Sequence, residues 1–168
     1  MRQHSFQRYD AVKYARQWAY KRNPAYLDFD FLGGDCTNFV SQCIYAGCGV
    51  MNYTPTYGWY YITSENRTAS WTGVNYLYEF LVNNREEGPF ATQVSLEETV
   101  PGDVIQLSNG EKFYHSLFVT QVNPFDADTA QNLNQILVTT HTFDSIDRKL
   151  GSYVFHSLRV LHILGYRT

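Results

Sequence analysis

The stretch Gly33–Gln42, which reads GGDCTNFVSQ, places a cysteine directly after an acidic residue at the start of an apolar pattern. Asp35 is a residue type that commonly caps helices, and apolar residues then recur at helical spacing. The pattern predicts a helix from about Cys36 to Ala46, with Gly47 as its C-terminal stop. One side of this helix carries Cys36, Phe39, Val40, Cys43, Ile44 and Gly47. We expect that side to face a sheet, with Cys36 at the exposed end of a buried stripe.

The position of Cys36 favours a reactive thiol. The helix dipole and the unpaired N–H groups of a first turn stabilise an anion, which lowers the pKa of a thiol and makes it a nucleophile. The adjacent charge of Asp35 acts in the opposite direction. The alternative is a small core residue, which is how we interpret Cys43. Cys48 lies between two glycines in a loop and has no partner that the sequence identifies.

The composition fits one globular domain that covers residues 1–168. Three cysteines exclude a complete disulfide framework, and their spacing matches no zinc pattern, so we expect no metal and no other cofactor. A net charge of −3 without basic clusters argues against nucleic acid as a partner. No apolar run reaches the length of about 20 residues that a membrane helix needs. The oligomeric state stays open.

The periodicity changes along the chain from helical to strand-like. Helices are predicted over Tyr9–Lys21, Cys36–Ala46 and Trp71–Asn84, and strands over Asp103–Leu107, Phe113–Val122, Gln135–His141 and Tyr153–Leu164. The stretch Asn52–Thr72 has no clear period and is predicted to be a long loop. Helices followed by antiparallel strands indicate an α+β fold, with N-terminal helices packed on an antiparallel sheet.

His115 is the best candidate for a base that activates the thiol. It opens the strand Phe113–Val122 and, by alternation, shares a face with Phe113, Leu117 and Val119. We expect this face to point toward the helix that begins at Cys36. His4 lies in a terminus that we expect to be frayed, and we interpret His156 and His162 as structural residues of the last strand.

His141 is the candidate for a third polar member of the site. If Val122 pairs with Gln135, His115 faces position 142, one residue from His141, so the two rings can be neighbours. His141 could then fix the tautomer and orientation of His115, as the third member of a triad does. Asp144 is a competing candidate for this role. A strand-end histidine without a role is the remaining interpretation.

Several motifs together resemble a known family. The segments GGDCTNFVSQCIYAG, PGDVIQL, HSLFVTQV and TTHTFD occur in the order found in the putative amidase domain of bacteria. The likeness runs from about Tyr9 to Gly151. That family resembles the papain-like group, which includes the NlpC-type and CHAP cell-wall hydrolases. The resemblance implies a papain-like fold, with Cys36 as nucleophile, His115 as general base and His141 as the orienting residue. Papain itself has an asparagine in the third role.

These observations predict an amidase or peptidase that cleaves an amide bond through a thioester on Cys36. The backbone N–H of Cys36 is a natural oxyanion donor, and we look for a second donor in the segment Asn23–Tyr26. Aromatic residues could line a substrate groove or could belong to the core: Tyr57, Trp59, Tyr60, Tyr61 and Trp71.

The resemblance suggests a peptide or a peptidoglycan fragment as substrate. Two alternatives stay open, an acyltransferase that uses the same triad and an inactive peptide- or glycan-binding module of the same fold. The N-terminal residues MRQHSFQRYD lack the apolar segment of a secretory signal. We therefore expect a cytoplasmic protein, unless the chain is a fragment of an exported cell-wall protein.

Overall fold

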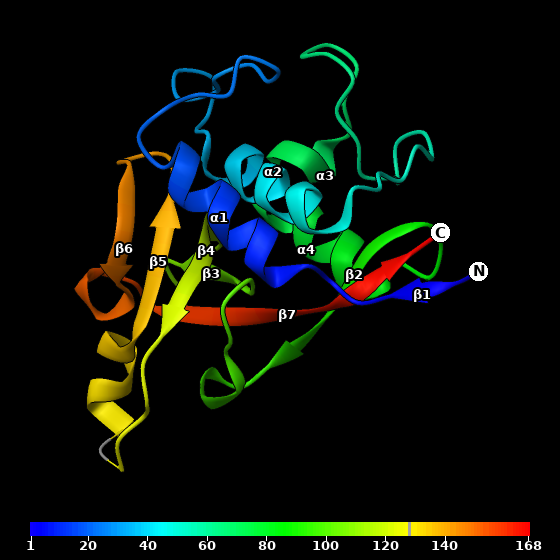
Figure 1. Cartoon of the computed structure of the whole chain (residues 1–168). Coiled ribbons are helices and arrows are strands. Elements are labelled where there is room, and N and C mark those ends of the chain that lie inside the picture. Colours follow the sequence, from blue (N-terminus) through cyan, green and yellow to red (C-terminus); the bar gives the residue numbers. More distant parts are fainter. Residues whose placement is uncertain (128) are drawn as a thin grey trace.

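The chain folds into a layer of helices on one face of a curved antiparallel sheet, as the computed structural model in Figure 1 shows. The structure describes residues 1–127 and 129–168. The helices are α1 (Arg8–Trp18), α2 (Cys36–Cys48), α3 (Ala69–Thr72) and α4 (Val74–Asn83), with 3-10 helices η1 (Leu96–Glu98), η2 (Thr129–Gln135) and η3 (Leu150–Ser152). The strands are β1 (Gln3–His4), β2 (Gly88–Val94), β3 (Val104–Ser108), β4 (Phe113–Val122), β5 (Ile136–Thr140), β6 (Ser145–Lys149) and β7 (Ser157–Arg167).

The sheet has the strand order β1-β7-β3-β4-β5-β6, and β2 also pairs with β7. Every pairing is antiparallel. The predicted α+β class with an antiparallel sheet is therefore confirmed. The strand predicted over Phe113–Val122 has the observed bounds of β4, whereas β1, β2 and β6 were not predicted.

The two faces of the sheet are both covered. On β4, Phe118 packs into the cluster that includes α1, α2 and α4. Leu117 and Val119 point the other way and join a second cluster, which Leu133 of η2 and Leu150 of η3 cover. A strand buried on both faces has apolar residues at odd and even positions, so its sequence does not reveal which face meets the helices.

Helix α2 is buried on almost every side, including its polar positions. Asn38 Oδ1 accepts a hydrogen bond from Trp71 Nε1 at 2.9 Å, and Ser41 Oγ accepts one from Trp59 Nε1 at 3.1 Å. Each buried indole N–H and its partner are thereby satisfied, which removes the cost of burying them. Asn38 and Ser41 of α2 thus attach the segment 52–72, which carries Trp59 and Trp71, to the helix.

The aromatic residues of the segment 52–72 divide between the core and the surface. Trp59, Tyr61 and Trp71 are buried in the helix-side core, Tyr60 packs partly against it, and Tyr57 is exposed. The sequence analysis left open whether these residues line a substrate groove or belong to the core. Most of them belong to the core. Two isolated bridges, Asn52 with Trp59 and Tyr61 with Arg67, give the predicted loop some order.

Glycines explain two differences from the predicted helices. Helix α2 continues past Gly47 to Cys48 and ends at Gly49, which has the left-handed φ of 64° common at helix ends. The helix predicted over Trp71–Asn84 is divided into α3 and α4, because Gly73 between them has an extended backbone. Position 47 has no space for a side chain, because the ring of Phe6 in the N-terminal segment packs against the backbone there.

The pairing of β4 with β5 is close to the predicted register. Val122 pairs with Ile136, one residue from the predicted partner, and a bulge follows between Val119 and Gln121. Beyond the bulge the predicted register holds, with Phe118 opposite Thr139. The strand β5 ends at Thr140, so His141 lies just beyond it.

We expect Gly47→Ala to destabilise the protein, although alanine is the better helix former. A Cβ at this position would lie 2.3 Å from a ring carbon of Phe6. Overpacking typically costs about 1–3 kcal/mol, which thermal unfolding should report as a Tm lower by at least about 2 °C. Adding Phe6→Leu should recover most of the loss. A Gly47→Ala protein that is as stable as the parent would contradict this explanation.

Candidate active site

Cys36 is the first residue of α2, as predicted, and its thiol lies against β4. Its sulfur is 3.8 Å from Thr37 Oγ1, and the backbone N–H groups of Ser116 and Thr37 face it. Thr37 Oγ1 and Ser116 Oγ form a hydrogen bond of 3.0 Å, which fixes the start of α2 to the strand. Because the N–H of Ser116 belongs to the peptide that joins His115 to Ser116, the sulfur lies beside that peptide.

Burial raises the pKa of the Cys36 thiol above its ordinary value, and this effect outweighs the lowering by the N–H groups of Ser116 and Thr37. The prediction of a lowered pKa was therefore wrong, since it placed the sulfur in a more exposed position. Burial also raises the pKa of Cys43 strongly and that of Cys48 to about 12. Cys43 has no exposed surface and lies in the core, as predicted.

His115 shares its face of β4 with Leu117 and Val119, as alternation predicts, but this face points away from the helices, which corrects the expectation that it meets α2. Its neighbour Ser116 contacts α2, whereas the ring of His115 packs near Tyr153 with centroids 6.1 Å apart. Phe113 lies on the helix side, where Arg159 stacks on both its ring and that of Tyr78 in α4. Phe113 leaves the predicted face because a bulge next to Leu107, which pairs with His115, interrupts the alternation between Phe113 and His115.

The electrostatic surroundings of His115 favour a neutral ring. Burial and then the positive charge of Arg148 lower its pKa from 6.5 to about 4. In the part of the chain that the structure describes, neither ring nitrogen has a hydrogen-bond partner, and no hydrogen bond joins the ring to Cys36. His115 is therefore neutral near pH 7 and able to accept a proton.

Asp35 stands at the cap position of α2 but does not cap it. Its Oδ1 accepts hydrogen bonds from the N–H of Phe29 at 2.9 Å and from Asn38 Nδ2 at 2.8 Å. Its Oδ2 lies 2.5 Å from His141 Nδ1. Because the carboxylate is used in these contacts, the N–H group of Cys36 is left without a side-chain cap.

His141 is buried and its two ring nitrogens both face oxygen atoms. Nδ1 faces the carboxylate of Asp35, and Nε2 donates to the backbone oxygen of Trp18 at 2.8 Å. The ring also stacks on Phe39 with centroids 4.0 Å apart. The ring therefore joins the carboxylate of Asp35 to the backbone of Trp18 through buried polar contacts.

The structure brings His141 to Asp35, next to Cys36, and not to His115. Asp144, the other candidate for an orienting residue, pairs instead with Arg22 at 2.9 Å. The role of His141 or Asp144 as a third member beside His115 therefore has no contact to support it. The sequence analysis missed the contact between Asp35 and His141, because it assigned the carboxylate to the helix cap.

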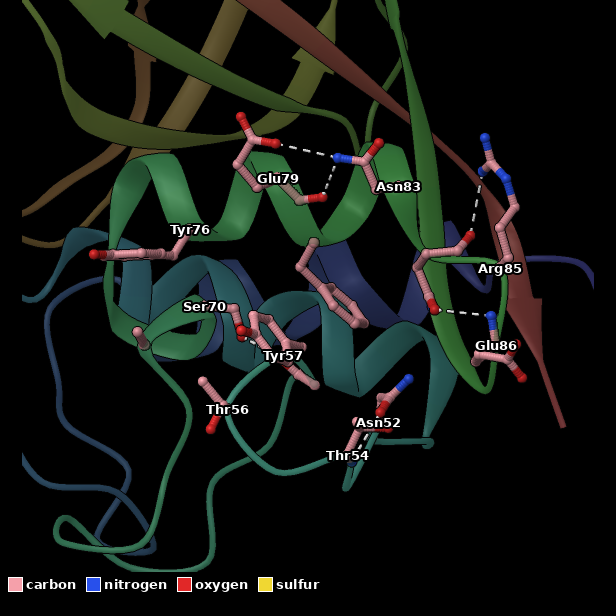
Figure 2. A pocket seen from close by; sticks show the side chains of 14 residues that line it. Asn52, Thr54, Thr56, Tyr57, Ser70, Tyr76, Glu79, Asn83, Arg85 and Glu86 are labelled. Atoms are coloured by element: carbon pink, nitrogen blue, oxygen red, sulfur yellow. Dashed lines mark hydrogen bonds between the residues drawn. The ribbon is translucent and has the colours of Figure 1, made fainter.

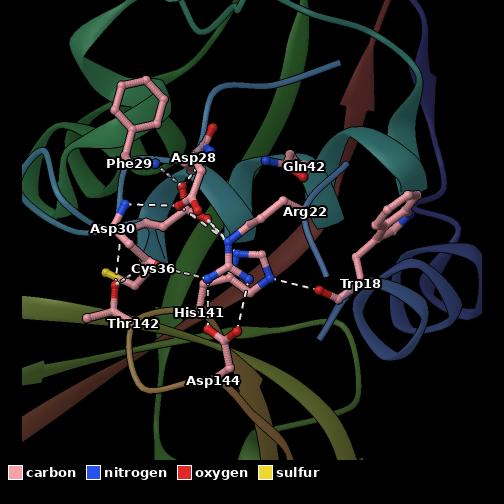
Figure 3. A network of polar contacts seen from close by, with 12 residues as sticks. Trp18, Arg22, Asp28, Phe29, Asp30, Cys36, Gln42, His141, Thr142 and Asp144 are labelled. Atoms are coloured by element: carbon pink, nitrogen blue, oxygen red, sulfur yellow. Dashed lines mark hydrogen bonds and ion pairs between the residues drawn. The ribbon is translucent and has the colours of Figure 1, made fainter. Parts of the chain in front are cut away.

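Arg22 joins the segments on either side of this pair, as Figure 3 shows. Its guanidinium binds Asp30, which lies in the loop before α2, and Asp144, which lies in the turn after β5. Asp28 and Asp35 lie within 3.3 Å and 3.7 Å of its Nε. The loop and the turn are therefore fixed to each other at the N-terminal end of α2.

A pocket of about 670 Å³ lies elsewhere, between the loop that contains Tyr57 and helix α4 (Figure 2). Its walls include Tyr57, Tyr76 and Phe80, and its rim includes Asn52 and Glu79. It shares no residue with the surroundings of Cys36. In the described residues, no group of acidic, cysteine or histidine side chains is arranged to hold a metal ion, and no helix is long and apolar enough to cross a membrane.

Comparison with known proteins assigns the chain to a family. The model of the putative amidase domain matches residues 5–163, and the chain therefore belongs to this family, whose description suggests a hydrolase of amide bonds. A curated relative, uncharacterized protein YhbB of Bacillus subtilis (strain 168), is 34% identical over 144 residues, which cover 83% of this chain. The chain spans only 42% of that relative's length. No solved structure matches it significantly.

We expect a strong coupling between Asp35 and His141 in a double-mutant cycle. Asp35→Asn and His141→Gln should each lower the free energy of unfolding by about 1–3 kcal/mol, because each weakens the contact and leaves a buried polar group without its hydrogen-bond partner. The double variant should lose clearly less than both together. Urea unfolding would measure these values. Asp28→Asn, a control at a more exposed carboxylate, should cost less than about 1 kcal/mol, and additive losses at the buried pair would contradict this coupling.

The lowered pKa of His115 predicts a pH dependence of stability. Between pH 6.5 and about 4, the unfolded chain binds more protons at this residue than the folded protein does. Stability is therefore lost as the pH falls through this window, by about 3 kcal/mol in all. Urea unfolding at pH 4.5 and 7 should show a smaller difference for His115→Gln than for the parent. The control His156→Gln, at an exposed ring, should show the same difference between the two pH values as the parent. If His115→Gln also showed the parent's difference, burial would not be holding His115 neutral.

Proposed function

We propose that this protein is an amidase or peptidase that uses Cys36 as its nucleophile and His115 as its general base. The single observation that supports this proposal is the position of the sulfur, beside the peptide that joins His115 to Ser116. Strand β5 ends at Thr140, and its first pair with this part of β4 is at Phe118. The edge of β4 at His115 is therefore free of a neighbouring strand, and the start of α2 occupies this place.

Both groups are neutral in the resting protein, so the proton would move during the attack and not before it. The thiol is neutral because burial raises its pKa, and the imidazole is neutral because burial lowers its own. Cys36 would attack the amide carbonyl carbon while its proton passes to His115. Because the ring of His115 lies on the other face of β4, the proton would have to pass around the edge of the strand, through a water molecule, to a ring nitrogen. The tetrahedral intermediate would collapse to a thioester as the amine departs with that proton. Water would then attack the thioester, with His115 again as base, and release the carboxylic acid and the thiol.

The free start of α2 would stabilise the negative oxygen of the intermediate. The N–H of Cys36 points out of the first turn, where the partial positive charge of the helix is greatest. If Asp35 capped the helix, its negative charge would lie at this first turn, on the N–H groups of Thr37 or Asn38. Its carboxylate binds the N–H of Phe29 and the side chains of Asn38 and His141 instead. In this proposal His141 acts through Asp35, by keeping the carboxylate away from the first turn, and it does not orient His115.

The papain-like group is the best candidate for the wider relationship. A cysteine at the start of a helix, packed on an antiparallel sheet whose next strands carry a histidine, is the arrangement that the resemblance implies. The same resemblance favours a peptide or a peptidoglycan stem peptide as substrate. No cofactor takes part in the proposed steps.

The replacement Cys36→Ala tests the nucleophile. We expect it to reduce the hydrolysis of peptide amides by at least about a thousandfold, because the group that forms the covalent intermediate is removed. Intact mass spectrometry of the parent, quenched in acid during turnover, should detect a thioester that is absent from the variant. Cys48→Ser is the matched control and should keep the activity. A fully active Cys36→Ala protein would exclude this mechanism.

A further inference from the structure

Large apolar side chains stand exposed on both segments that border Cys36. Phe31 and Leu32 lie in the loop directly before α2 and are 98% and 66% exposed. Phe143, in the turn between β5 and β6, is 88% exposed. None of the three contributes much to the core, so packing does not account for them. They are not scattered singly over the surface, because their segments meet at the start of α2.

Contacts between the two segments bring the stretches of chain that carry these side chains together beside the start of α2. Thr142, which precedes Phe143, accepts a hydrogen bond from the N–H of Asp35 at 2.9 Å, and Asp35 directly precedes Cys36. Figure 3 shows Thr142 next to Cys36. Thr142 Oγ1 also lies 3.4 Å from Asp30, which precedes Phe31. Arg22 ties the same two segments together through its ion pairs with carboxylates of both.

The turn that carries Phe143 has an unfavourable backbone conformation. Thr142 and Phe143 have φ angles of 60° and 59°, a left-handed region that glycine and asparagine adopt readily and that β-branched or bulky residues avoid. Two such residues in succession cost stability, and strain of this kind is concentrated at functional sites. The hydroxyl of Thr142 has a structural contact that accounts for its presence. The ring of Phe143 has none, since it projects into solvent.

We propose that Phe143, together with Phe31 and Leu32, forms a binding site for a bulky apolar side chain next to the scissile amide. This inference rests on the proposed function of Cys36. It names the substrate as a peptide with a large aliphatic or aromatic residue within one position of the cleaved bond. A stem peptide of peptidoglycan, whose residues are small or charged, would gain little from this surface.

Two replacements of Phe143 separate its role in binding from its role in the fold. Phe143→Asn removes the apolar ring and suits the left-handed backbone, so its Tm should be equal to that of the parent or higher. Phe143→Leu keeps an apolar side chain and the strain. The substrates are two synthetic peptides that differ in one residue next to the cleaved amide, leucine in one and serine in the other, and a peptidoglycan stem peptide.

We expect Phe143→Asn to lower kcat/KM for the leucine peptide by about tenfold or more, with little change for the serine peptide. Phe143→Leu should stay within about threefold of the parent for both. Tyr9→Ser, at an exposed aromatic residue of α1, is the control and should change neither value. Equal kcat/KM values for the leucine and serine peptides in the parent, or an unchanged preference in Phe143→Asn, would overturn the proposal. So would a preference for the stem peptide.

The proposed function can fail or stand independently of this inference. If Cys36→Ala abolishes hydrolysis and Phe143→Asn leaves the preference unchanged, the nucleophile stands and only the apolar site is rejected. If the parent cleaves none of the peptides, binding of the fluorescently labelled leucine peptide to Cys36→Ala decides the question. Binding that Phe143→Asn weakens about tenfold in that background would support the apolar site, and no binding would reject it.

Discussion

The buried contact between Asp35 and His141 is the constraint on which the arrangement of this protein depends. It joins the start of α2 to the end of β5, and through Trp18 and Phe29 it also holds the end of α1 and the loop before α2. Polar side chains are costly to bury, and they are tolerated where each atom finds a partner. Here the carboxylate and the imidazole have all their partners within one small volume. The end of α1, the loop that leads into α2 and the turn after β5 are thereby fixed around one cysteine.

Two histidines lie near Cys36 in this arrangement, and their surroundings differ. His141 holds the carboxylate that precedes the thiol, and His115 remains neutral and without a hydrogen-bond partner on the adjacent strand. The helix start therefore keeps free N–H groups beside a sulfur atom, although an acidic residue occupies the cap position. The family to which the chain belongs suggests a hydrolase of amide bonds, and our proposal assigns this chemistry to Cys36.

The fold could be predicted wherever periodicity was strong, and the site only in part. The helix at Cys36 and the strand Phe113–Val122 have clear apolar patterns, and both were found at or near their observed bounds. The face of His115 was assigned to the wrong core because both faces of β4 are apolar, and Phe113 was placed on that face because the sequence does not reveal the bulge between the two residues. The pairing of Asp35 with His141 was missed because local propensity suggested a helix cap, and a tertiary contact replaced it. The strained turn at Phe143 left no signal in the sequence, since its residues are not typical of such turns.

The separation of Asp35 from His141 by 106 positions has a consequence for biosynthesis. Contacts between residues so far apart in sequence form late, because the entropy of closing a long loop opposes them until the rest of the chain is in place. During translation the amino-terminal helices leave the ribosome well before β5. The nascent chain therefore carries Cys36 beside a carboxylate that is not yet anchored, and the contact of that carboxylate with His141 can form only after β5 has been synthesised.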